Sequence, residues 1–131
     1  MTPRRRHVLF VDDDEDLRAV MRILLDEEGY EFHGAGSIAE ASELLRTTTP
    51  DVLVLDMVVG FGSGTTILDE LAARPDPPVT VLISGLVDLI PIAMLYGNLP
   101  IVPKPFEIEH LMAAIDLAID KSRRPRRVAR A

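Results

Sequence analysis

The run from Val52 to Leu55 limits the possible folds of this chain more than any other stretch. It contains four large aliphatic residues in a row, with Pro50 shortly before it and a glycine-rich stretch after it. Such a run is typical of a strand that is buried on both faces of a parallel sheet. Asp56 follows at once, at the strand end where open α/β sheets place their ligand sites. Because a buried charge is costly, we expect Asp56 to have a partner or a chemical role.

Apolar runs of strand length alternate with helical patterns five times along the chain. We expect strands at residues 7–11, 30–34, 52–55, 79–83 and 101–102. The first helix should have a buried face whose residues repeat at helical spacing: Leu17, Val20, Met21, Leu24 and Leu25. Ser37 and Glu40 predict a capping box at the start of the second helix. The alternation predicts an α/β fold, a doubly wound parallel sheet with helices on both faces.

The composition excludes several classes of protein. A length of 131 residues suits one domain with a hydrophobic core. The absence of cysteine excludes a disulfide scaffold, thiol chemistry and cysteine-based zinc sites. No apolar run is long enough for a signal peptide or a membrane span. We therefore expect a soluble, cytoplasmic protein that makes no contact with a membrane.

The net charge of −7 is unevenly distributed along the chain. Basic residues gather at the ends, and we expect residues 1–6 and 122–131 to be flexible basic tails. Residues 7–120 contain five basic residues and all 21 acidic residues, so their net charge is −16. Such an acidic body should repel nucleic acid and attract metal cations or a basic partner surface.

Polar and charged residues follow four of the expected strands, and parallel strands place these ends at one edge of the sheet. They are Asp12, Asp13, Asp56, Ser84 and Lys104. Gathered carboxylates repel one another unless they share a cation, and their oxygen ligands suit a hard ion such as Mg²⁺. With a lysine and a serine hydroxyl nearby, the set suits a phosphoryl group. An aspartate in such a site can act as the nucleophile.

Other charged and aromatic residues have simpler interpretations. Asp14 and Asp16 fit the acidic first turn of a helix, and one of them should cap it. Tyr96 is expected to serve in packing. The histidines show no spacing typical of metal ligands, and we expect ordinary surface or partly buried side chains at His7, His33 and His110.

Over residues 7–121 the sequence resembles the receiver domains of bacterial two-component response regulators. Four motifs carry the resemblance, in order and at matching strand ends: Val11-Asp12-Asp13, Asp56, Ser84-Gly85 and Lys104-Pro105-Phe106. Gly64 also matches the family's loop glycine. The resemblance implies a (βα)5 flavodoxin-like three-layer sandwich, with a five-stranded parallel sheet in the order 2-1-3-4-5.

The resemblance also implies the roles of the site residues. Asp56 would accept the phosphoryl group, and Asp13, Asp56 and the backbone carbonyl of Val58 would bind Mg²⁺. Asp12 would act on the metal through water. Lys104 would pair first with Asp56 and then with a phosphoryl oxygen, and Ser84 would hydrogen-bond the phosphoryl group. The domain would be a signalling switch that catalyses its own Mg²⁺-dependent phosphorylation and dephosphorylation.

The sequence departs from the family pattern at several positions. Ile101 stands where the family usually has an aromatic switch residue, and Gly60 stands where proline is common. The span from Ser84 to Lys104 is shorter than usual, and Pro91 lies in the fourth expected helix. Val58 and Leu86 flank the site and cannot orient an attacking water molecule, which predicts slow self-dephosphorylation.

The implied partners are a histidine kinase or histidine phosphotransfer protein, and a downstream protein target or an effector domain outside this sequence. The chain is either a stand-alone regulator or a piece of a longer protein. One alternative is a receiver-like interaction module that works without phosphorylation, which the Ile101 and Pro91 region makes conceivable. An aspartyl-phosphate hydrolase is disfavoured, because such enzymes have a second aspartate where this chain has Val58.

Overall fold

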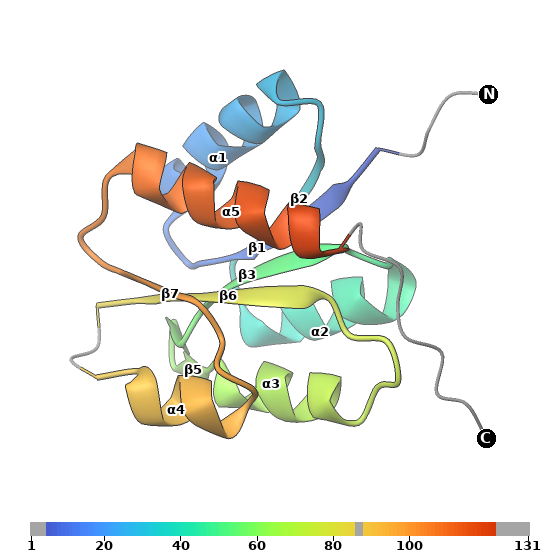
Figure 1. Cartoon of the computed structure of the whole chain (residues 1–131), viewed down its shortest axis with the longest axis vertical. Helices are drawn as coiled ribbons and strands as arrows, with labels where there is room; N and C mark the ends of the chain where they lie inside the picture. Colours follow the sequence, from blue (N-terminus) through green and yellow to red (C-terminus); the bar gives the residue numbers. More distant parts are fainter. Residues whose placement is uncertain (1–4, 86–87, 123–131) are drawn as a thin grey trace.

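A computed structural model describes residues 5–85 and 88–122 of the chain (Figure 1). The strands of the main sheet are β1 (His7–Val11), β2 (Glu31–Ala35), β3 (Val52–Asp56), β6 (Val79–Ser84) and β7 (Ile101–Pro103). The helices are α1 (Glu15–Glu27), α2 (Ile38–Thr47), α3 (Thr65–Ala72), α4 (Ile90–Leu95) and α5 (Ile108–Ser122). Most of the two predicted tails, residues 1–4 and 123–131, lies outside the described residues.

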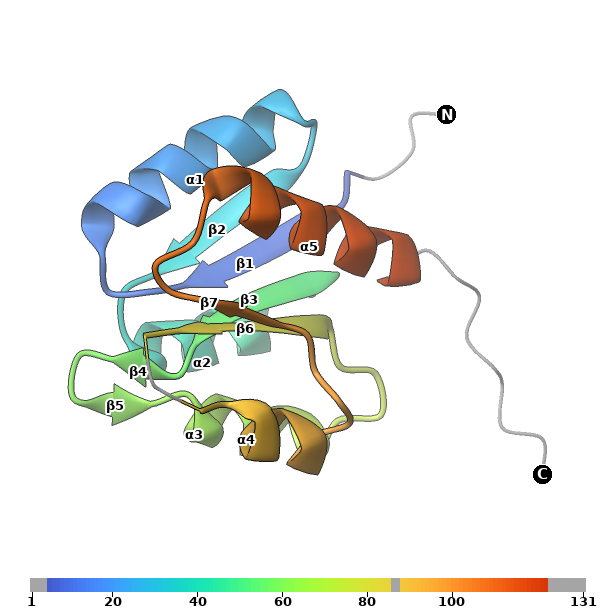
Figure 2. The same ribbon diagram turned by 60° about the vertical axis from the view of Figure 1, so that its left-hand side comes forward.

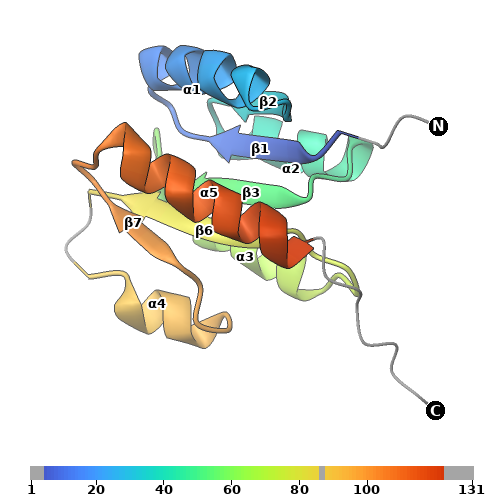
Figure 3. The same cartoon turned by 45° about the horizontal axis from the view of Figure 1, so that its top comes forward.

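The main sheet is parallel throughout, in the order β2-β1-β3-β6-β7. Counted among the strands of this sheet alone, that is the predicted order 2-1-3-4-5. Helices α1 and α5 cover one face, and α2, α3 and α4 cover the other, as Figures 1 and 3 show from two directions. The predicted three-layer α/β fold is therefore confirmed.

Both faces of β3 are buried, as the unbroken apolar run predicts. Leu53 and Leu55 pack in the core on the α2 and α3 side, while Val52 and Val54 pack in the core on the α1 and α5 side. All four side chains are fully buried. This strand lies in the middle of the sheet, between β1 and β6. Its position brings Asp56 to the centre of the sheet's carboxyl edge.

Two helix starts show the predicted caps. Asp14 is the N-cap of α1, and its Oδ1 accepts a hydrogen bond from the N–H of Leu17 at 3.1 Å. The Ser37 hydroxyl caps α2 by accepting from the N–H of Glu40 at 3.1 Å. The reciprocal bond of the box comes from the N–H of Gly36 to the Glu40 carboxylate, one residue earlier than expected.

The prediction that Val20 is buried is wrong, because its side chain is 44% exposed. Met21 and Leu25 are fully buried on α1. Each residue turns a helix by about 100°, so Val20 lies at the margin of the stripe that Met21 and Leu25 define. In α4, Pro91 occupies the first turn, where proline is tolerated because its missing N–H has no helical partner.

The glycine-rich stretch after β3 forms a small antiparallel hairpin that the sequence did not predict. It consists of β4 (Val58–Val59) and β5 (Gly62–Ser63) and projects beside the carboxyl edge of the sheet (Figure 2). Gly60 makes the turn with a φ of +59°, which glycine adopts at little cost. The loop therefore has a defined conformation next to Asp56.

We expect Ser37→Ala to destabilise the protein by about 1 kcal/mol, because the substitution removes the N-cap acceptor of α2. Urea unfolding followed by circular dichroism measures the change in the free energy of unfolding. Ser37→Asp is the matched control, since it keeps an oxygen acceptor and should retain most of the stability. An unchanged unfolding midpoint in Ser37→Ala would show that the cap does not contribute.

Candidate functional site

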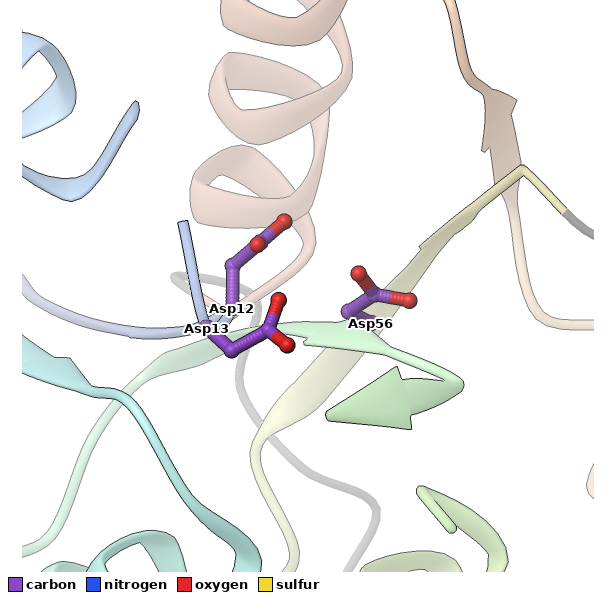
Figure 4. Close-up of side chains that lie close together, drawn as sticks. All are labelled: Asp12, Asp13 and Asp56. Carbon is purple, nitrogen blue, oxygen red and sulfur yellow. The ribbon is translucent and has the colours of Figure 1, made fainter. Parts of the chain in front are cut away.

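Three carboxylates meet at the carboxyl edge of the sheet. Asp12 and Asp13 follow β1, and Asp56 is the last residue of β3. Their side chains lie close together in Figure 4, and one carboxylate oxygen from each lies within 4.8 Å of the others. Within residues 5–85 and 88–122 this is the one group of three or more such side chains close enough to share a metal ion. The fold thus brings together the aspartates singled out in the sequence.

Asp12 is fully buried and holds its carboxylate with two hydrogen bonds. Its Oδ1 accepts from the N–H of Asp14 at 2.9 Å, and its Oδ2 accepts from Lys104 Nζ at 2.6 Å. Burial raises the pKa of Asp12 above its ordinary value, although the bonds from Lys104 and Asp14 act in the opposite direction. This carboxylate is therefore fixed in place and depends on the lysine for its charge balance.

The Asp56 side chain is 6% exposed and is also held at both oxygens. Its Oδ1 accepts from the N–H of Val58 at 3.0 Å, and its Oδ2 accepts from Lys104 Nζ at 2.8 Å. These bonds orient the carboxylate at the end of the central strand. One of its oxygens is therefore positioned by the backbone and the other by a side chain.

Lys104 is distant from the aspartates in the sequence and bridges the two buried carboxylates. It follows β7, and its backbone N–H donates to the carbonyl of Ser84 at 2.9 Å. Burial alone would lower the pKa of its ammonium group, but the hydrogen bonds and charges of Asp12 and Asp56 raise it above the ordinary value. Lys104 therefore stays protonated at neutral pH and provides a permanent cation between the two carboxylates.

Asp13 differs from the other two aspartates because it is exposed. Its Oδ2 accepts a hydrogen bond from the N–H of Gly60 at 2.9 Å, in the turn of the β4–β5 hairpin. The hairpin is thereby attached to the carboxylate cluster. An exposed carboxylate beside two buried ones leaves the cluster accessible from the hairpin side.

Gly64 allows the loop to return closely to the end of β3. Its N–H donates to the carbonyl of Met57 at 2.9 Å. A Cβ at Gly64 would lie 2.8 Å from the backbone oxygen of Asp56 and 3.0 Å from the Cα of Met57, and backbone atoms cannot easily move away. The family's loop glycine is thus explained here by a close backbone approach beside Asp56.

Arg18 is a residue at the site that the sequence analysis missed. Its Nη1 donates to the backbone carbonyl of Asp12 at 2.7 Å. The guanidinium lies against Gly36, where an added Cβ would be 2.8 Å from Nη1. No sequence signal marks this contact, because it requires α1 and the end of β2 to lie side by side. Arg18 supports the turn that presents Asp12 and Asp13.

The remaining predicted residues have different surroundings. Ser84 is buried at the end of β6, one residue beyond the register partner of Asp56. Ile101, at the family's aromatic position, is partly buried against the core beneath α3 and α4. The hydroxyl of Tyr96 donates to Asp69 on α3 at 2.5 Å, and this bond raises the pKa of Tyr96. Leu86 lies outside the described residues.

The charges of the site suit a hard cation. When all are ionised, three carboxylates and the Lys104 ammonium leave an excess of two negative charges. The donor atoms are all oxygens, which Mg²⁺ and Ca²⁺ prefer, and neither histidine nor cysteine belongs to the group. The residues present therefore fit a magnesium ion that keeps some of its own water ligands.

The structure combines a parallel α/β sheet with an acidic cluster and a lysine at its carboxyl edge, and this arrangement suits a metal ion and a phosphoryl group. The family model for the response regulator receiver domain matches residues 8–116, and the chain belongs to this family. The chain is 34% identical over 120 residues to the transcriptional regulatory protein PdtaR of Mycobacterium tuberculosis, covering 90% of this chain and 58% of PdtaR. It is 30% identical over 118 residues to the regulatory protein VirG of Agrobacterium tumefaciens, covering 87% of this chain and 43% of VirG.

Solved structures agree with the fold. The non-phosphorylated receiver domain of HemR from Leptospira biflexa superimposes with a TM-score of 0.83 at 22% identity, covering 93% of this chain and 99% of that domain.

The curated relatives are longer proteins, and the chain spans about half of their length. Among the described residues, no helix is long and apolar enough to cross a membrane.

We expect Gly64→Ala to destabilise the protein by about 1–3 kcal/mol, because the new Cβ overpacks against the backbone at Asp56. Guanidinium unfolding measures the loss. Gly85→Ala is the matched control, since nothing lies within 4 Å of a Cβ at Gly85. Equal stability of the Gly64→Ala and Gly85→Ala variants would contradict the close approach.

Proposed function

We propose that residues 7–121 form a receiver domain that takes a phosphoryl group from a histidine kinase or histidine phosphotransfer protein onto Asp56. The observation that carries this proposal is the fixed Asp56 carboxylate, whose two oxygens accept from Val58 N–H and Lys104 Nζ. The residues at the ends of the chain, 1–6 and 122–131, are basic tails in this proposal, and the chain acts in the cytoplasm.

The site would work with a bound magnesium ion. Asp13 and Asp56 would bind the ion directly, together with the backbone carbonyl of Val58, and Asp12 would act through water. The bound ion supplies positive charge that offsets the repulsion between Asp56 and an incoming phosphoryl group. The exposure of Asp13 and the all-oxygen donor set support this assignment.

In the proposed transfer, a carboxylate oxygen of Asp56 attacks the phosphorus of a phosphohistidine. The new O–P bond forms as the P–N bond breaks, and the imidazole leaves with the electron pair and takes up a proton. Lys104, already 2.8 Å from Asp56 Oδ2, moves its hydrogen bond to a phosphoryl oxygen. The Ser84 hydroxyl donates a hydrogen bond to another phosphoryl oxygen. Attack of water on the phosphorus of the resulting acyl phosphate breaks the bond to Asp56, restores the carboxylate and releases inorganic phosphate.

The output would begin at Ser84 and pass to a downstream protein target or to an effector domain outside this sequence. By the family resemblance, β7 carries Ile101 at the position where receiver domains usually have an aromatic switch residue, and Ile101 packs against the core. Movement of Ser84 would therefore be transmitted through the β6–β7 pairing, in which Ser84 is the register partner of Pro103. The same replacement favours the second candidate function, an interaction module that works without phosphorylation.

Acetyl phosphate with Mg²⁺ should add one phosphate to the intact protein, and Asp56→Asn should abolish the addition because its amide is not nucleophilic. Mass spectrometry of the intact chain measures the gain. Asp120→Asn, an exposed substitution on α5, is the control and should be phosphorylated normally. The absence of uptake in the wild type would favour the phosphorylation-independent module, and uptake by Asp56→Asn would place the acceptor elsewhere.

The phosphorylated protein should lose its phosphate slowly by itself, because the apolar Val58 beside the site cannot orient water. Val58 is 44% exposed, so a polar side chain at this position would reach solvent near the phosphoryl group. Val58→Asn should therefore increase the rate of decay severalfold, as measured by loss of phosphate after the donor is removed. Rapid decay of the wild type without a partner would contradict this explanation.

A further inference from the structure

Two histidines that are 26 positions apart in the sequence lie together where β1 begins, away from the carboxyl edge of the sheet. His7 begins β1 and is 5% exposed, while His33 lies in the edge strand β2 and is partly exposed. His7 Nε2 and His33 Nδ1 are 2.6 Å apart, and the ring centroids are 4.5 Å apart. One ring therefore donates a hydrogen bond to the other. The facing nitrogens are also the atoms with which imidazoles bind metals.

A carboxylate lies on the same surface as the histidines. Glu31 and His33 are two residues apart in β2, so both side chains project from the same face of the strand. Glu31 is also the register partner of His7 in the neighbouring strand. All three residues line one pocket of about 210 Å³, together with Arg5, Thr48 and Thr49. Two ligands on one strand and a third on the next can converge on a single ion.

We propose that His7, His33 and Glu31 form a binding site for a transition-metal ion of the Zn²⁺ class. Two imidazoles and a carboxylate are ligands that this class of ion prefers, whereas Mg²⁺ prefers oxygen ligands alone. The fourth ligand would be water in the pocket. The site is separate from the aspartate cluster and does not depend on the proposed phosphorylation. From His7 to Asp12 the chain advances five residues along β1, about 16 Å at the rise of a strand.

The structure holds the first ligand firmly and leaves the other two adjustable. The backbone of His7 is tied to Asp51 by two hydrogen bonds, from His7 N–H to Asp51 Oδ2 and from Asp51 N–H to the His7 carbonyl, both 2.8 Å. His33 is only partly buried and Glu31 is exposed, so both side chains can reorient.

Metal binding requires these side chains to move, because in the structure the ligand atoms of the three residues do not all lie within 4.8 Å of one another. Nitrogens bound to one tetrahedral Zn²⁺ lie about 3.3 Å apart, so the two rings must separate by less than about 1 Å. The ring that donates the present hydrogen bond must also move its proton to its other nitrogen. Among the described residues that line the pocket, the Arg5 guanidinium is the one cationic side chain, and it is held by the carbonyls of Gly29 and Tyr30 and by Asp26.

Calorimetric titration of the full chain with Zn²⁺ tests the site. The protein carries no histidine tag, and excess Mg²⁺ is present throughout to saturate sites that favour hard ions. The wild type should bind one Zn²⁺ per chain, and His33→Ala should weaken binding by roughly tenfold or more. His110→Ala is the matched control, because it removes the third histidine of the chain from α5 and should bind as the wild type does. Glu31→Gln should weaken binding severalfold.

A second measurement needs no variant and so does not depend on how the variants fold. Paramagnetic Ni²⁺ should broaden the imidazole NMR signals of two of the three histidines and leave those of His110 sharp. Equal Zn²⁺ affinity in the wild type and His33→Ala, no Zn²⁺ binding by the wild type, or selective broadening of His110 would overturn the site. Unchanged affinity in Glu31→Gln would overturn the assignment of the third ligand.

Discussion

The Lys104 ammonium between Asp12 and Asp56 is the interaction on which the rest of the site depends. Lys104 Nζ is 2.6 Å from Asp12 Oδ2 and 2.8 Å from Asp56 Oδ2, although these residues are 92 and 48 positions away from it in the sequence. Two buried carboxylates beside each other would repel without this cation, and burial already raises the pKa of Asp12. The parallel topology makes the bridge possible, because it delivers the ends of β1, β3 and β7 to the same edge of the sheet.

The Lys104 ammonium balances only one of the three carboxylate charges, so the site keeps an excess of negative charge. Asp13 remains exposed and is attached to the β4–β5 hairpin through Gly60, while Arg18 holds the backbone of Asp12 from behind. Gly64 has no side chain, which lets the loop approach the backbone of Asp56. Gly36 in the same way leaves room for the Arg18 guanidinium. The result is an accessible, negatively charged, oxygen-lined edge, which suits a hard cation and a phosphoryl group.

Local patterns in the sequence predicted the features that depend on local rules. The apolar run at β3, the cap at Asp14 and the strand order implied by the family motifs agree with the structure. Val20 was misplaced because helical periodicity locates the centre of a buried stripe better than its margin. The hairpin, the Arg18 contact and the pairing of His7 with His33 were not predictable in this way. Each depends on which segments become neighbours in space, and the residues involved have no characteristic spacing along the chain.

A crystal structure grown with Mg²⁺ and beryllium fluoride, which mimics an aspartyl phosphate, would show directly whether Asp56 is the phosphoryl acceptor. We expect the beryllium atom to be bonded to a carboxylate oxygen of Asp56, and Mg²⁺ to be bound to Asp13, Asp56 and the Val58 carbonyl. Lys104 Nζ should exchange its contact with Asp56 for one with a fluorine atom. An Asp56 that stays unmodified and paired with Lys104, with Mg²⁺ absent from the aspartate cluster, would contradict the proposed role of Asp56.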